Sequence, residues 1–151
     1  KNANDTASTE SVMLEFINQN FFQDNDLFIL VQATSPLTQT RDFDMALKTL
    51  EFNKADSLLS CVRQKRVYWS NDATPLNYKL SNRPRRQDFD GILMENGAFY
   101  INSVVNIRND KNRLSGKIAI YEMAEYTAIE IDEEGDWLIA EQLMKKNNKC
   151  K

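Results

Sequence analysis

The sequence predicts a layered α/β fold, because helical and strand-like segments alternate along its first part. Residues 5–22 carry apolar side chains at helical spacing. Residues 27–31 form an unbroken apolar run, which is typical of a strand buried on both faces in a parallel sheet. A helix over 40–50 and a strand over 57–62 repeat the alternation, which favours a sheet covered by helices. The length of 151 residues suits a single domain, 1–151.

This alternation stops after Val62, where short aromatic segments separated by turns follow one another. They predict a small antiparallel excursion, which we place at 63–97. Exposed Tyr and Trp side chains in such an excursion are typical of a subunit interface, although a flap packed on its own domain shows the same pattern. The predicted order ends with strands over 98–101 and 118–123, a helix over 104–109, a brief extended run over 128–132 and a helix opened by Gly135 and Asp136.

The composition excludes several kinds of site and partner. The chain carries 22 acidic and 19 basic residues, a net charge of −3, whereas a general binder of nucleic acid is basic overall. No run approaches the roughly eighteen apolar residues of a membrane span. The absence of histidine excludes His-based triads and His-ligated zinc. The two cysteines, Cys61 and Cys150, form no disulfide framework, so we expect the reducing cytoplasm.

Three guanidinium groups lie within the four residues Arg83-Pro84-Arg85-Arg86. The proline disfavours helical geometry at Arg83, and an extended chain would turn Arg83 and Arg85 to one side and Arg86 to the other. Such an array suits bidentate binding of a carboxylate or a phosphate. A non-catalytic Arg-rich module, for nucleic acid or for dimerisation, is the alternative, which the net negative charge disfavours.

Polar side chains follow the first predicted strand, in Gln32-Ala33-Thr34-Ser35-Pro36. In open α/β sheets, ligands bind at the carboxyl ends of the strands, which makes this segment a candidate ligand site. Thr34 and Ser35 could equally cap backbone groups of a turn, whereas Gln32 is the stronger candidate for binding.

Glu130 and Asp132 are two residues apart, so an extended chain places both carboxylates on one face. Mg²⁺ takes oxygen ligands, often one or two carboxylates together with substrate phosphates and water. The pair is therefore a candidate magnesium site. Asp136 is a better candidate for a helix cap than for a third ligand.

Taken in order, the motifs of the chain resemble those of the CMP-sialic acid synthetases, the acylneuraminate cytidylyltransferases. The matching segments are Gln32 to Pro36, Tyr68-Trp69-Ser70, Arg83 to Gly91, Glu95 to Tyr100, Ile129 to Asp132, Asp136-Trp137 and Ala140-Glu141. The resemblance implies a three-layer Rossmann-like nucleotide-sugar-transferase fold, with its N-terminal part missing and with 63–97 as a dimerisation arm. It also implies a homodimer, with no nucleic acid or membrane as partner.

The resemblance implies that CTP and sialic acid are joined to CMP-sialic acid, with release of pyrophosphate and with Mg²⁺ as cofactor. It implies a metal held by Asp132 and Glu130, although many relatives carry Asp where this chain has Glu130. The substrate-binding residues that it implies are Ser8, Thr9, Gln32, Thr34, Ser35 and Gln87, with Arg85 or Arg86 acting across the dimer on the sugar carboxylate or the phosphates.

One departure from the family concerns the loop that cradles the triphosphate. The chain has 4 glycines, none of them in a phosphate-cradling cluster, and it starts at Lys1 rather than at a methionine. We therefore expect a C-terminal portion of an enzyme, inactive by itself. A sister cytidylyltransferase for a related nonulosonic acid, legionaminic or pseudaminic, is the nearest alternative function.

Overall fold

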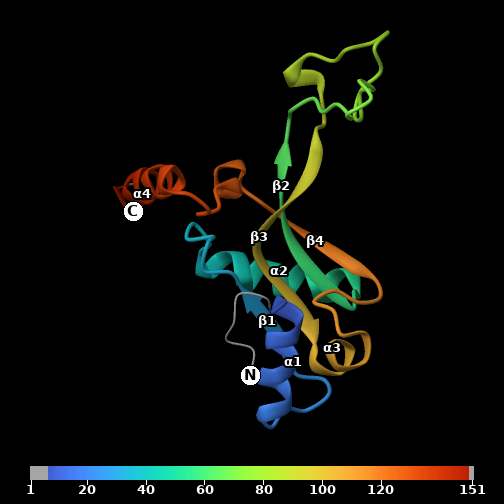
Figure 1. The fold of residues 1–151 in the computed structure, drawn as a ribbon, viewed down its shortest axis with the longest axis vertical. Helices are drawn as coiled ribbons and strands as arrows, with labels where there is room; N and C mark the ends of the chain where they lie inside the picture. Colours follow the sequence, from blue (N-terminus) through green and yellow to red (C-terminus); the bar gives the residue numbers. More distant parts are fainter. Residues whose placement is uncertain (1–6, 150–151) are drawn as a thin grey trace.

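The computed structural model describes residues 7–149 and shows one mixed sheet with helices on both of its faces (Figure 1). The sheet has the strand order β1-β3-β2-β4. The strands are β1 (Leu27–Val31), β2 (Ser57–Gln64), β3 (Ile92–Ser103) and β4 (Ile118–Met123). The helices are α1 (Thr9–Gln19), α2 (Thr40–Asn53), α3 (Val104–Asp110) and α4 (Glu134–Lys149), with short 3-10 turns over Arg86–Asp88 and Glu125–Ala128.

Two apolar clusters, one on each face, confirm the three-layer arrangement. Ala46 and Leu50 of α2 pack against Leu58, Phe99 and other residues of the central strands. Met13 and Ile17 of α1 pack with Val104 and Ile107 of α3, and the partly buried Phe28 and Leu30 of β1 join this second cluster. Ile29, the residue between them on β1, lies against the first cluster, as the alternation of side chains along a strand requires.

The sheet differs from the predicted parallel one in the direction of its longest strand. β3 runs antiparallel to both β1 and β2, and only β2 and β4 are parallel neighbours. Within residues 7–149, β1 pairs on one side only, so Leu27 and Val31 at its ends are about half exposed. The predicted coverage of both faces of β1 is seen at Ile29 on one face and at Phe28 and Leu30 on the other. The predicted parallel pairing is wrong, because an apolar run carries no information about the direction of its neighbours.

β3 is irregular where it passes the end of β1. Its register against β2 shifts between Leu59, opposite Tyr100, and Cys61, opposite Glu95. Gly97 lies in the part of β3 where the register shifts and adopts φ +62°, a conformation that favours glycine. Close by, the Phe99 N–H donates to the Ser60 hydroxyl at 3.1 Å. Bulges of this kind redirect side chains and are common beside functional sites.

The residues between β2 and β3 form an arm that extends away from the sheet (Figure 1). The arm contains only isolated bridges, Trp69 with Pro75 and Lys79 with Asn82, as expected for a small antiparallel excursion. At its base, Arg63 donates to both carboxylate oxygens of Glu122, at 2.9 and 2.7 Å. Leu76 and Leu80 near its far end are 65% and 68% exposed.

The last helix begins at Glu134, one residue before the predicted opening at Gly135 and Asp136. Asp136 accepts the backbone N–H groups of Asp132 and Glu133, at 3.2 and 3.0 Å, so it caps the helix from within its first turn. In the described range, no helix is long and apolar enough to cross a membrane. Cys61 is a buried free thiol, and Cys150 lies outside the described residues.

Candidate functional site

Gln32 and Glu130 meet at Gly97 of β3, although the three residues are far apart in the sequence. A Cβ atom on Gly97 would lie 2.6 Å from Oε1 of Gln32 and still closer to Oε1 of Glu130. Backbone bonds hold this arrangement, since Gln32 N–H donates to Ala98 C=O at 3.1 Å and Ile131 N–H donates to Thr34 C=O at 2.8 Å. The predicted strand end and the predicted acidic pair therefore form one site.

The environment of the Glu130 carboxylate raises its pKa. Burial raises the pKa of Glu130, and the charges of Asp132 and Glu95 raise it further. We predicted an extended run for the segment that carries Glu130 and Asp132. In the structure this segment is not a strand of the sheet, and it follows the 3-10 turn Glu125–Ala128. The two carboxylates are two residues apart in this segment, and the charge of Asp132 is one of the causes that raise the pKa of Glu130.

The carboxylates of the site provide only part of a coordination shell for Mg²⁺. In residues 7–149, no three His, Cys, Asp or Glu side chains converge closely enough to hold a metal ion. Mg²⁺ often uses just one or two protein carboxylates and completes its shell with phosphate oxygens and water. Glu130 and Asp132 suit such a site, and Asp136 is engaged as a cap.

The two hydroxyl residues after Gln32 have different environments. Ser35 is buried, and its hydroxyl donates to Asn96 C=O at 3.4 Å, a long bond that ties the turn to β3. Thr34 is exposed beside the segment that carries Glu130. Of the two, Thr34 has the side chain that a ligand could reach.

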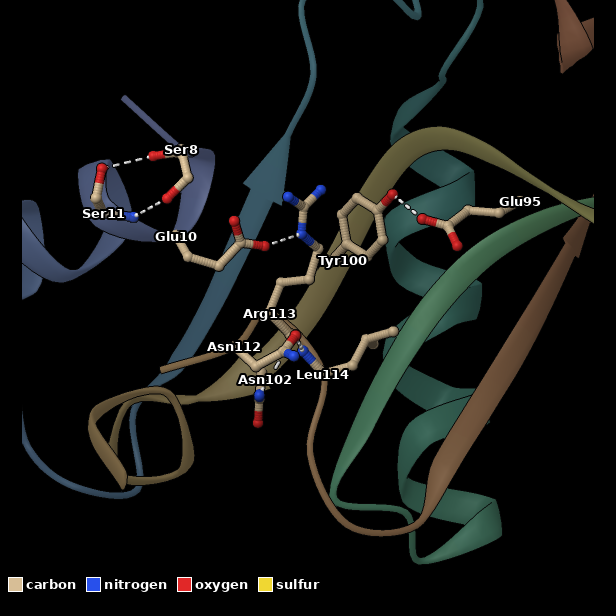
Figure 2. A network of polar contacts seen from close by, with 9 residues as sticks. All are labelled: Ser8, Glu10, Ser11, Glu95, Tyr100, Asn102, Asn112, Arg113 and Leu114. Carbon is tan, nitrogen blue, oxygen red and sulfur yellow. Dashed lines mark hydrogen bonds and ion pairs between the residues drawn. The ribbon is translucent and has the colours of Figure 1, made fainter. Parts of the chain in front are cut away.

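The predicted nucleotide contacts Ser8 and Thr9 lie at the start of α1. Ser8 is the N-cap of this helix, and its hydroxyl oxygen accepts the Ser11 N–H at 3.2 Å (Figure 2). Thr9 is the first residue of the helix and is partly exposed.

The arginines of the arm are grouped differently from the predicted alternation. Arg83 and Arg86 line one open hollow of about 410 Å³, together with Lys65 and Arg66. Arg85 turns away and pairs with Asp88 at 2.6 Å. The 3-10 turn that starts at Arg86 breaks the extended geometry, which is why the alternation failed.

Within this chain, the arm arginines and Gln32 do not come together. Arg86 approaches Glu125 at 3.7 Å, and the Arg83 guanidinium lies 5.6 Å from the centroid of the Tyr78 ring. Gln87 is an exposed residue of the 3-10 turn. A role for Arg85, Arg86 or Gln87 at the Gly97 site therefore requires a second copy of the chain or a movement of the arm.

A polar chain that the residue patterns did not predict joins α1 to this site (Figure 2). Arg113 Nε donates to Glu10 Oε1 at 2.6 Å, and the Arg113 guanidinium lies 4.9 Å from the centroid of the Tyr100 ring. The Tyr100 hydroxyl donates to the Glu95 carboxylate. Glu95 and Tyr100 occur in one of the matching motifs, whereas nothing in the sequence around Arg113 marks it.

We predict that Glu130→Gln stabilises the folded protein at pH 7. The raised pKa of Glu130 means that the folded state favours the neutral acid, so its carboxylate costs stability as the pH rises from the unfolded value, about 4.5, through the folded one. The neutral amide removes this cost, with a gain within about 0.5 kcal/mol, as is usual for partly exposed positions. Urea unfolding at pH 7 and pH 3.5 measures the gain.

The gain should disappear at the acid pH, where both side chains are neutral. Glu133→Gln, a change at a neighbouring exposed carboxylate, is the control and should show no such pH-dependent gain. A gain in the free energy of unfolding of Glu130→Gln that grows as the pH falls would contradict the raised pKa of Glu130.

A comparison with solved structures identifies the fold class of the chain. The chain superposes on 4-diphosphocytidyl-2C-methyl-D-erythritol synthase from Anaerococcus prevotii with a TM-score of 0.62, covering 93% of this chain and 68% of that one at 10% identity. At this identity the likeness concerns the fold alone. The architecture is that of a nucleotidyltransferase-like α/β domain, as predicted.

Comparison with characterised sequences is more specific. The chain is 36% identical to the N-acylneuraminate cytidylyltransferase of Oncorhynchus mykiss and 33% identical to N-acylneuraminate cytidylyltransferase B of Danio rerio, over 91% of its length in each case. It spans about a third of the length of these relatives, 33% and 34%. No family model matches the chain. The chain is therefore a homologue of part of the N-acylneuraminate cytidylyltransferases, which confirms the resemblance of its motifs.

Proposed function

We propose that the protein carrying this chain transfers the cytidylyl group of CTP to a sialic acid. In this reaction the anomeric hydroxyl oxygen bonds to the α-phosphorus, the bond from that phosphorus to pyrophosphate breaks, and the hydroxyl proton is released. The observation that supports the proposal best is the meeting of Gln32 and Glu130 at Gly97, because it unites in one site two of the segments on which the resemblance to the family rests.

The candidate site at Gly97 has neutral side chains, which would bind the sugar acid, and carboxylates, which would bind a metal ion. Gln32 offers an amide that can both donate to and accept from a polyhydroxylated acid. Thr34 would line the same pocket, while the buried Ser35 would support its wall. Glu130 and Asp132 would hold a magnesium ion, which would withdraw charge from the phosphate oxygens when bound.

The exposed arm supports a homodimer in which each arm reaches the partner's site. The arm exposes Leu76, Leu80 and about half of Trp69, which is typical of a surface that another subunit covers. Its hollow of cationic side chains carries charge of the sign that a triphosphate or a sugar carboxylate requires. The buried, unpaired thiol of Cys61 suits the cytoplasm as the location.

The test is an assay of the native protein with CTP, N-acetylneuraminate and Mg²⁺, with pyrophosphate release as the readout. We expect turnover that requires all three components. Legionaminic and pseudaminic acid, assayed in parallel, distinguish the nearest alternative: a preference for either would assign the protein to a related cytidylyltransferase. Steeply salt-dependent binding of random oligonucleotides without turnover would favour an Arg-rich binding module instead.

Residues 1–151 alone should neither turn over CTP nor bind it more tightly than about 1 mM by isothermal titration. The reason is that the glycines at 91, 97, 116 and 135 are dispersed, so the chain lacks a clustered backbone cradle for three phosphates. Micromolar binding of CTP to these residues would refute this expectation.

A further inference from the structure

The side chains of Glu10, Arg113, Tyr100 and Glu95 form a continuous connection across the molecule. In Figure 2, Arg113 lies between the Glu10 carboxylate on α1 and the Tyr100 ring on β3, and the Tyr100 hydroxyl points to Glu95. Glu95 lies on β3 two residues before Gly97, the glycine at which Gln32 and Glu130 meet. The connection thus runs from the first turn of α1 to the acidic side of the candidate site.

The burial of this connection makes it stronger than an ordinary surface pair. The side chains of Arg113 and Glu10 are only 22% and 28% exposed, and Tyr100 is buried. Arg113 lowers the pKa of Glu10, while burial, followed by the Glu95 interaction, raises the pKa of Tyr100 to about 12. Glu10 therefore stays charged and Tyr100 stays a hydrogen-bond donor at neutral pH, so every link persists there.

Arg113 is itself held in place from the other side. Its backbone carbonyl accepts from Asn102 of β3 at 3.3 Å, and Asn102 also donates to the Ser115 hydroxyl at 3.0 Å. Ser115 and Ser57 exchange two further hydrogen bonds, at 2.8 and 3.0 Å. The loop that carries Arg113 is thus tied to two strands of the sheet and forms a fixed support.

The start of α1 depends on this support more than the rest of the helix does. The buried residues of α1, Met13 and Ile17, pack on α3 from the second turn onward. Glu10 is in the first turn, next to Ser8 and Thr9, and Arg113 ties it to β3. Moving or weakening the guanidinium would therefore shift the first turn while leaving the apolar packing intact.

We propose that Arg113 is a positioning residue that sets the distance between the start of α1 and the Gln32–Glu130 site. The inference rests on the proposed function and on the predicted contact of Ser8 and Thr9 with the nucleotide. Arg113 would then control how CTP binds and would leave the sugar acid, held at Gln32, largely unaffected.

The test is the steady-state kinetics of Arg113→Lys in the native protein. Lysine keeps the charge but loses the planar fork and the stacking surface. We expect the KM for CTP to rise about tenfold, equivalent to about 1.4 kcal/mol, with the KM for N-acetylneuraminate and kcat changed less than about twofold. Glu10→Gln should have the same signature, and the double variant should be no worse than either single variant.

Lys145→Met is the matched control, because it also breaks an ion pair, but an exposed one on α4, with Glu141. It should leave both KM values unchanged. A loss of kcat without a selective rise in the KM for CTP would mean that Arg113 only stabilises the fold, and it would overturn the proposal.

Hydrogen exchange of the backbone amides in the first turns of α1 tests the positioning role without any turnover. Arg113→Lys should speed exchange there and leave α2 unchanged. If the wild-type protein fails to use CTP but α1 loosens as expected, the proposed function is wrong and the positioning of α1 by Arg113 stands. Unchanged exchange in α1 would overturn that positioning, whatever the enzyme does.

Discussion

Asp132→Ala should reduce magnesium-dependent turnover roughly 1,000-fold in the native protein. A metal ion that polarises phosphate oxygens contributes several kcal/mol to transition-state stabilisation, and about 4 kcal/mol corresponds to this factor. Asp132 is the more exposed member of the acidic pair, whereas Glu130 is partly buried against Gly97. Its carboxylate is therefore the better placed to reach a metal bound to a substrate phosphate.

The fold should tolerate this change. Asp132 contributes its backbone N–H to the Asp136 cap, and the alanine variant keeps that N–H. Across the described range, no hydrogen bond or ion pair is recorded for the Asp132 carboxylate itself, so we expect the free energy of unfolding to change by less than about 0.5 kcal/mol. Kinetics at several Mg²⁺ concentrations, together with urea unfolding, measure both expectations.

Glu133→Ala is the matched control, since Glu133 is the next residue, is exposed and also donates its N–H to Asp136. It should keep near-normal activity. Near-normal magnesium-dependent activity of Asp132→Ala would show that the metal assignment is wrong.

The sequence predicted local features of this site better than its long-range pairings. The strand end at Gln32 depends on neighbours a few residues away, and in the structure β1 ends at Val31, directly before Gln32. The antiparallel course of β3 depends on which strands meet, which periodicity does not encode.

The same distinction explains why Arg113 was missed. Its partners, Glu10 and Tyr100, are far from it in the chain, and a single arginine in a polar connector has no distinguishing pattern. Gly97 is an intermediate case. A glycine within an apolar strand predicts a close approach, but only the structure shows that Gln32 and Glu130 are what approaches it.

The predicted alternation of the arm arginines is wrong, but the contacts of Arg85 and Arg86 in the structure distinguish these two residues. Arg85 is held by Asp88 at 2.6 Å. Arg86 makes only a long contact, 3.7 Å, with Glu125, and its side chain is 74% exposed. Both pairs are exposed and contribute little to stability, but Arg85 is hydrogen-bonded to Asp88 whereas Arg86 is only within ion-pair distance of Glu125, so Arg86 is the less engaged of the two. We therefore expect Arg86, rather than Arg85, to act on a substrate.

Arg86→Ala should lower kcat/KM at least about a hundredfold, in the range found when one charge-stabilising donor of a transition state is lost. Arg85→Ala, the matched control at the preceding residue, should cost far less. Neither change should unfold the protein, because both side chains are exposed. Steady-state kinetics and thermal unfolding of both variants provide the comparison.

Mixed dimers decide whether Arg86 acts across the interface. If it does, combining Arg86→Ala subunits with Asp132→Ala subunits creates one site per dimer that has both an intact arginine and an intact carboxylate pair. About a quarter of the wild-type activity should then return at a one-to-one mixture, because about half of the dimers are mixed after random exchange and one of the two sites in each mixed dimer is complete. No recovery, with exchange of subunits verified by mass spectrometry, would mean that Arg86 acts within its own chain or outside the site.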